Sequence, residues 1–514
     1  MVAVNKIDSN VVGLSYAEEA SLKTLPGSPV WYALDPNSFS DFGGQLRLLA
    51  RDPINASRQR KKGVIADLDA AGGFNDDLTI SNIQDLFQGF FFADFRRKAE
   101  ELVTAVDIDG ANPDEYEVAD STGFVANQLI KGVGFANAAN NALNLVTAVT
   151  AGTVEVATGQ LVAEPSPPSG AKITVVGRQA ASGDIDVDAT GDLPAITSSA
   201  LDLTTLGVKV GEPVFLGGDA AGLRFANAVN NGFKRARTIT ANRMEFDKSD
   251  SPMVNETGTG LTIQIFVGRV IQNETGALIK RRSYQLERTL GAPDDASPSQ
   301  IQSEYITGAI PNQLTVNVPQ ADKVTCDLAF VGLDHEQRSG ATGVKAGDRI
   351  PITEQDAFNT SSNVPRIKLA QVVAGNEAPN ALFAFVTELT LTVNNNVSPD
   401  KAVGVLGAFD ATAGQFVVNG SITAYFSDIA AVQAVRNNAD VTLDIALVVS
   451  NGGVVFDVPL LALGDARATI EKDRPITIPL SADAATGAKI DPNLDHTLMV
   501  VFFDHLPDLA NPTS

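Results

Sequence analysis

The chain contains very few of the residues that redox and metal chemistry require. Its 514 residues include one cysteine, Cys326, and three histidines. A single cysteine excludes an intramolecular disulfide framework and any metal site built from several cysteines. One tryptophan and six tyrosines are also few for a cleft that binds sugars by stacking. We therefore expect no cofactor and no metal.

Positive charge is scarce as well. The 38 Lys and Arg residues face 61 Asp and Glu residues, which gives a formal net charge of −23 at pH 7. Proteins that hold nucleic acid tightly neutralise many phosphates with Lys and Arg, so tight binding is disfavoured. The contents of 44% hydrophobic and 19% charged residues are ordinary for folded soluble proteins. The composition thus favours a globular protein that contacts polyphosphates only loosely.

Long hydrophobic runs are the third absence. No apolar stretch is long enough to span a bilayer, so no membrane partner is expected. The first residues, Met1–Asp8, lack the charged start and apolar core of a secretory signal. The sequence therefore predicts folding in the cytoplasm.

The most informative pattern is an internal repeat. The segment 135–142 (FANAANNA) returns at 225–232 (FANAVNNG) with a constant offset of 225 − 135 = 90 residues, and the copy continues without a gap through 155 and 245. Both copies keep an alternating apolar face and a turn, carried by the pairs Val149/Ile239, Val154/Met244, Val156/Phe246, Asn140/Asn230 and Asn141/Asn231. We expect two small β-units in tandem, inserted between about 106 and 275.

The flanking frame predicts further strands. Residues 13–34 read as a strand, a turn and a strand, followed by a loop and a strand at 64–68. Ser81 to Gln84 has the form of a capping box, and the apolar stripe behind it predicts a helix over 81–103. After the insertion we expect a strand at 284–288 and a hairpin of 313–318 with 324–331.

A second series then follows the same order. It predicts a strand at 382–393, a strand at 421–426, a helix that begins at Ser427-Asp428, and a hairpin of 443–449 with 454–463 around Asn451-Gly-Gly. The frame is therefore interpreted as doubled. The expected division is 1–105 and 276–335 for the first copy of the frame, 106–196 and 197–275 for the two inserted β-modules, and 336–514 for the second copy.

Few side-chain patterns indicate a site. The run Asp184-Ile-Asp-Val-Asp188 resembles the start of a calcium loop, but Ala189 and Ala195 occupy the glycine and glutamate positions, so a solvated strand face is favoured. The histidines His335, His496 and His505 each adjoin a carboxylate, yet no catalytic or metal motif accompanies them, and surface or turn positions are expected. We expect no catalytic residue.

One basic cluster stands out in this acidic chain. Arg58, Arg60, Lys61 and Lys62 lie in the long loop before the strand at 64–68. They are either a solvated loop or a group that contacts an acidic patch of another molecule.

Several segments together resemble the tail tube proteins of long-tailed, siphovirus-type bacteriophages. The opening Gly13-Leu-Ser-Tyr-Ala-Glu-Glu-Ala20 is similar to the start of that family, and Pro311-Asn-Gln-Leu314 through Gly332 is similar to its central hairpin. The stretches Leu389-Thr-Leu-Thr-Val-Asn-Asn395 and Asn419-Gly-Ser-Ile-Thr-Ala-Tyr-Phe426 are the most characteristic. The resemblance covers roughly two-thirds of the chain, and the repeat is similar to insertions that decorate some members.

The resemblance implies a mainly β fold: a tail-tube-type β-sandwich or barrel with flanking helices, in two tandem copies. It also implies a structural, non-enzymatic virion protein, assembled in the host cytoplasm, that forms axially stacked rings around transiting double-stranded DNA without binding it tightly. Single-fold members form hexameric rings, and two-fold members form pseudo-hexameric trimers, so the doubled frame favours a trimer. Other partners would be the tape measure, terminator and distal tail proteins, and the basic cluster would contact the next ring.

Two other classes remain open at the level of the sequence. A bacterial surface or adhesion protein could also be built from tandem acidic β-modules, although the missing signal segment disfavours it. A carbohydrate-active β-sandwich enzyme could use paired carboxylates, but the few aromatic residues disfavour that alternative.

Overall fold

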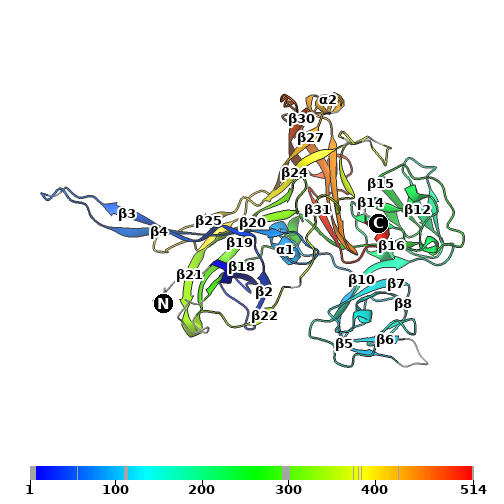
Figure 1. The fold of residues 1–514 in the computed structure, drawn as a ribbon, viewed down its shortest axis with the longest axis horizontal. Coiled ribbons are helices and arrows are strands. Elements are labelled where there is room, and N and C mark those ends of the chain that lie inside the picture. Colours follow the sequence, from blue (N-terminus) through cyan, green and yellow to red (C-terminus); the bar gives the residue numbers. More distant parts are fainter. Residues whose placement is uncertain are drawn as a thin grey trace. The chain divides into compact units, whose positions relative to one another are not determined.

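The computed structural model describes residues 7–511 except 8, 55, 109–113, 292–300, 353, 374, 380, 384 and 427. The secondary structure is 48% strand and 9% helix, which confirms the mainly β fold. The chain forms two compact units, each made of segments far apart in sequence (Figure 1). Unit 1 comprises Met1–Asp94, Asn273–Thr360 and Thr387–Ile422, and unit 2 comprises Phe95–Gln272, Ser361–Val386 and Thr423–Ser514.

The first sheet of unit 1 has the strand order β22-β2-β1-β18-β19-β21, and only the β2–β22 pair is parallel. Two of its residues, Trp31 and Tyr305, are fully buried, and the Trp31 indole donates a hydrogen bond to the Ala346 carbonyl at 3.2 Å. The expected strand-turn-strand over 13–34 is confirmed. The strands are β1 (Gly13–Glu18), β2 (Val30–Leu34), β18 (Tyr284–Gly291), β19 (Gln302–Val318), β21 (Asp334–Ser339) and β22 (Asp348–Ile350).

Strand β19 belongs to both sheets of unit 1. Its first half pairs with β21 and its second half with β20, and Gly308 lies between these two paired segments. Gly308 has φ 60, a conformation that glycine adopts without steric cost. Its N–H donates to the buried Glu19 carboxylate at 3.0 Å, which fixes the bend.

The second sheet of unit 1 has the order β3-β4-β20-β19-β24-β27. The pairing of β19 with β20 confirms the expected hairpin at 313–331. Residues 38–51, expected to be loop, instead form a strand. The additional elements are β3 (Ser38–Arg51), β4 (Lys61–Asp77), β20 (Thr325–Gly332), β24 (Val386–Asn394), β25 (Ser398–Asp400), β26 (Asp410–Thr412) and β27 (Val417–Tyr425).

The helix expected over 81–103 is much shorter. Helix α1 spans only Gln84–Phe91, and Phe92 ends it in a left-handed conformation with φ 48. The expected capping box is wrong, because the N-cap is Ile83 and no side chain caps the helix. The apolar stripe is confirmed, since Leu86, Phe87, Phe90 and Phe91 are all buried. The residues after Phe92 have helix-forming composition, but tertiary strand pairing overrides that preference.

In unit 2 the first repeat copy is a closed six-stranded barrel. The strands follow the order β5-β6-β9-β8-β7-β10, and β10 pairs back with β5. Closure leaves no free sheet edge and encloses a core that includes Tyr116, Ile130 and Val154. The strands are β5 (Glu100–Asp107), β6 (Asp114–Val118), β7 (Gln128–Val133), β8 (Leu143–Thr150), β9 (Thr153–Val156) and β10 (Lys172–Gln179).

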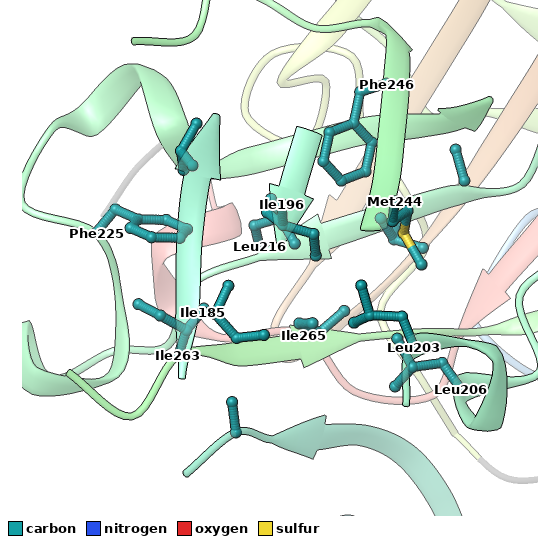
Figure 2. Packing of buried hydrophobic residues seen from close by; sticks show 14 of the residues in the cluster. Ile185, Ile196, Leu203, Leu206, Leu216, Phe225, Met244, Phe246, Ile263 and Ile265 are labelled. Atoms are coloured by element: carbon teal, nitrogen blue, oxygen red, sulfur yellow. The ribbon is translucent and has the colours of Figure 1, made fainter. Parts of the chain in front are cut away.

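The second copy repeats this strand order as β11-β12-β15-β14-β13-β16, with β16 against the end of β10. Figure 2 shows its core, in which Ile185, Met244, Phe246 and Ile265 point into the space between the strands. The duplication seen in the sequence is thus a duplication of structure. The strands are β11 (Ile185–Asp188), β12 (Ala195–Ser198), β13 (Pro213–Leu216), β14 (Gly232–Thr240), β15 (Arg243–Lys248) and β16 (Gln264–Phe266).

The repeated asparagines form the predicted turn and also bind a carboxylate in each copy. Asn140 and Asn230 are fully buried. The Asn140 side-chain amide donates to Glu164 at 2.9 Å, and the Asn230 amide donates to Glu256 at 2.6 Å. These buried donors and acceptors need partners, so the two residue types must be retained together.

The rest of unit 2 is a sheet in which β29 pairs with β28 on one side and with β30 and β31 on the other. The expected hairpin at 443–463 is confirmed. The second helix is also present, but it begins at Ala430 rather than at Ser427-Asp428 and has no side-chain cap; Ser427 itself lies outside the described residues. An apolar cluster that includes Phe233, Phe266, Val501 and Phe503 joins the second repeat copy to this sheet. The elements are β17 (Arg269–Gln272), β23 (Arg366–Gln371), α2 (Ala430–Arg436), β28 (Val441–Val449), β29 (Gly452–Gly464), β30 (Thr477–Ala485) and β31 (Met499–Phe503).

Candidate assembly surface

The hairpin of β3 and β4 extends beyond the sheet of unit 1 as a two-stranded ribbon (Figure 1). We call residues 46–66 the arm. At its base, Phe74 of β4 is buried and β4 pairs with β20 between Ala70 and Asp77. Beyond that pairing the arm has only its own two strands. An isolated two-stranded ribbon is marginally stable in water, so packing against another surface would stabilise it.

The arm carries large apolar side chains on both faces. Leu48 pairs with Ile65 and Leu49 pairs with Val64, and because neighbouring residues point to opposite faces, each face holds one of these pairs. Leu48 is 67% exposed and Val64 is 54% exposed. Clustered exposed apolar residues of this kind mark interaction surfaces.

The four basic residues singled out from the sequence all lie at the tip of the arm. Arg60 forms an ion pair with Asp52 at 3.6 Å, but both side chains are exposed and such pairs contribute little. Arg58, Lys61 and Lys62 have no ion-pair partner among the described residues. Arg51 and Lys61 are direct cross-strand neighbours, and like charges in that position destabilise a hairpin. The tip is therefore an unneutralised cationic group in an acidic protein.

A lysine anchors the base of the arm. Lys401 donates to Asp67 at 2.6 Å and also bonds to Asp69, both on β4. The hydrogen bond from Lys401 holds the pKa of Asp67 below its ordinary value. The free part of the arm thus begins at about residue 66.

The other residues that the sequence offered as candidate sites are packed within the fold. His496 and His505 are buried, so a surface position is wrong for these two, although both lie in segments outside the strands and helices. Asp184 is also buried rather than solvated, and it accepts hydrogen bonds from the Ser199 and Ala200 N–H groups at 2.9 and 2.7 Å. Its carboxylate holds the loop at 199–200 in place. The alternation of polar and apolar residues along a strand could not reveal this contact.

No group of three or more His, Cys, Asp or Glu side chains in the described ranges is arranged to hold a metal ion. Within the same ranges, no helix has the length and apolarity needed to cross a membrane.

The comparison with protein families decides the identity. The model of the phage tail tube protein family matches residues 9–484. The chain belongs to the phage tail tube protein family. No match was found among curated proteins. Membership gives this tail tube protein a structural role in the virion tail and implies self-assembly with other tail components. The resemblance read from the sequence is confirmed, and the adhesion and glycosidase alternatives gain no support.

Proposed function

We propose that this tail tube protein assembles into axially stacked rings and that the stack is the conduit for DNA in the phage tail. The observation that carries the proposal is the arm, whose apolar faces and cationic tip are uncovered in a single copy. A second copy would cover them. Repeated head-to-tail contacts of this kind produce an open filament.

The basic residues Arg58, Arg60, Lys61 and Lys62 are proposed to contact the neighbouring ring. Their position at the end of a projecting ribbon supports this role, because the ribbon is long enough to reach another subunit. The seventeen residues of β4 span about 55 Å at the usual rise per residue.

A trimeric ring with pseudo-sixfold shape is proposed for the doubled frame. The order of two strands, a short helix and a strand hairpin occurs as β3, β4, α1 and β19–β20, and again as β24, β27, α2 and β28–β29. The proposed division keeps 1–105 with 276–335 as one fold, 336–514 as the second, and 106–196 and 197–275 as inserted modules.

An acidic chain suits a conduit. With a net charge of −23, the lumen would hold few of the Lys and Arg residues that bind phosphates, so double-stranded DNA would slide past. The proposed partners are the tape measure, terminator and distal tail proteins, with assembly in the host cytoplasm.

Electron microscopy of the purified full-length protein at increasing concentration tests the proposal. We expect rings and stacked tubes, with three chains per ring by symmetry averaging. A protein that remains a monomer at all concentrations, and also with its tail partners added, contradicts the proposal. Hexameric rings would retain the conduit and reject the trimer.

A further inference from the structure

At the base of the same hairpin that forms the arm, unit 1 has a pocket of about 730 Å³. Its walls come from the end of β2, the end of β4, the start of α1 and the segment after β22. Six carboxylates line it: Asp35, Asp76, Asp77, Asp85, Glu354 and Asp356. The pocket is therefore strongly anionic.

Little within the subunit neutralises this charge. Lys323 pairs with Asp77 at 2.8 Å. Asp35, Glu354 and Asp356 have no ion-pair partner among the described residues. The walls expose these three side chains to solvent, where an incoming cation could reach them.

Asp76 provides a second, independent observation. It is only 3% exposed, and its Oδ1 atom accepts a hydrogen bond from the Asp77 N–H at 2.8 Å. Its other oxygen, Oδ2, is buried without a hydrogen-bond partner. Buried carboxylate oxygens are normally paired, so an unpaired one in the wall of a pocket indicates a missing donor.

The missing donor has the chemistry of an ammonium or guanidinium group. The carboxylates of the described pocket do not converge on one point as ligands of a metal ion do. A strand tip that presents several Lys and Arg side chains could instead contact carboxylates spread over a wide pocket, and guanidinium groups bind carboxylates in a bidentate manner.

We propose that the cationic tip of the arm, with Arg58, Arg60, Lys61 and Lys62, docks in this acidic pocket of the next copy of the chain. The hairpin sets the geometry. Lys61 and Asp76 lie at opposite ends of β4, about 50 Å apart along the strand. A translation of one subunit by the length of its own hairpin brings the tip of one copy to the pocket of the next. The inference rests on the proposed function and names the partner surface of its stacking contact.

Disulfide trapping in assembled tubes tests the docking. We would combine Arg60→Cys with Glu354→Cys in the full-length protein, where the native Cys326 is fully buried and should not react. Each link joins one copy to the next, so mild oxidation should give a ladder of multimers on a non-reducing gel. Arg60→Cys combined with Glu388→Cys is the matched control, because Glu388 is an exposed carboxylate of unit 1 outside the pocket. It should give no ladder.

The outcomes separate the two proposals. Tubes without a ladder refute the docking and leave the conduit intact, whereas the absence of tubes in the wild-type protein refutes the conduit. Tubes that form only with added Mg²⁺ or Ca²⁺, and without the ladder, would assign the pocket to a metal ion and overturn the docking.

A charge exchange gives a second readout that does not depend on cysteine chemistry. Arg58→Glu with Arg60→Glu, or Glu354→Lys with Asp356→Lys, should each lower the yield of tubes about tenfold or more, the effect of losing about 1.4 kcal/mol. The four changes together should restore assembly. Failure of the combined variant to recover, while circular dichroism shows it folded, contradicts the docking.

Discussion

At the scale of single residues, Asp76 should reduce the stability of the isolated subunit. Burial raises the pKa of Asp76 from 3.8 to about 7. A raised carboxyl pKa stabilises the folded state below pH 3.8, and this contribution is lost as the pH rises through 7. The variant Asp76→Asn removes the charge and keeps an oxygen for the Asp77 N–H. We expect it to raise the free energy of unfolding at pH 8 by about 2–4 kcal/mol.

Urea denaturation of the monomer at pH 5 and pH 8 measures this effect. The gain should be smaller at pH 5, where the wild-type carboxyl is largely protonated. Asp35→Asn, at an exposed position in the same pocket, serves as control and should change stability by less than about 0.5 kcal/mol. Equal gains at both pH values would contradict the assignment.

His496 acts in the opposite pH direction. Burial lowers its pKa from 6.5 to about 4, so the folded state keeps the ring neutral while the unfolded chain takes up a proton. Stability should therefore fall as the pH drops from about 6.5 to about 4, by up to about 3 kcal/mol from this group. His496→Leu should reduce that loss, measured by urea denaturation at pH 7 and pH 4.5. The variant still contains His505, and burial lowers the pKa of this residue to about 4 as well. Part of the pH dependence of stability should therefore persist.

The sequence revealed some of these residues and not others. The cluster from Arg58 to Lys62 was visible because four cations within five residues stand out in an acidic chain. The pocket was not, because its carboxylates come from three separated segments that carry no motif. Burial of His496 and His505 depends on tertiary packing, whereas the carboxylates next to them in the sequence favoured positions exposed to solvent.

At the scale of elements, a buried ionic group joins the second repeat copy to β29. Arg235 donates to Asp247 at 2.7 Å and to Asp457 at 3.1 Å, and Lys248 donates to Asp457 at 2.7 Å. Asp457 is 1% exposed, and the nearby Lys248 and Arg235 help to lower its pKa to about 2 despite its burial. The first copy has Leu145 and Thr158 at the positions 90 residues before Arg235 and Lys248, so the two copies differ where one of them meets the sheet.

Breaking this group should be costly. Asp457→Asn removes the ion-pair partner of the buried Lys248 and leaves the buried Arg235 with Asp247 alone, and we expect a loss of about 3–5 kcal/mol in the free energy of unfolding. Asp495→Asn removes a carboxylate that is half exposed and pairs with Lys209, and it should cost less than about 1 kcal/mol. Thermal denaturation followed by circular dichroism compares the two variants. Losses of similar size would show that the buried group contributes no more than an exposed ion pair.

Elements were predictable where one face is buried. Alternation located the hairpins at 313–331 and 443–463 because their inward side chains contact a core. Strand β3 was missed because both faces of the arm are exposed and carry apolar side chains, as the neighbours Leu48 and Leu49 show, so no sustained polar–apolar alternation marks the whole strand. The helix was overestimated because Arg96 pairs with Val270 as a bridge in unit 2, a contact between segments that local composition does not report.

At the scale of the whole molecule, the arm should decide whether rings stack. The 90-residue repeat could be read from the sequence, but the shared strand order of the two copies and the closure of the first copy into a barrel could not, because they depend on pairings such as β10 with β5. A barrel without free edges offers no strand to a neighbour. Among the described strands, the arm is the part whose exposed apolar faces most need another molecule.

The last prediction follows from this contrast. A variant in which residues 48–66 are replaced by a two-residue Asn-Gly turn, which keeps the pairing of Arg47 with Asp67, should fold, because the base of β4 keeps its pairing with β20 and its contact with Lys401 through Asp69. It should form single rings but no stacked tubes in electron micrographs, whereas Arg58→Ala with Arg60→Ala should weaken stacking only partly, since the apolar faces remain. The rise per ring in wild-type tubes should not exceed about 55 Å, the length of β4. Tubes of normal length from the shortened variant would show that another surface joins the rings.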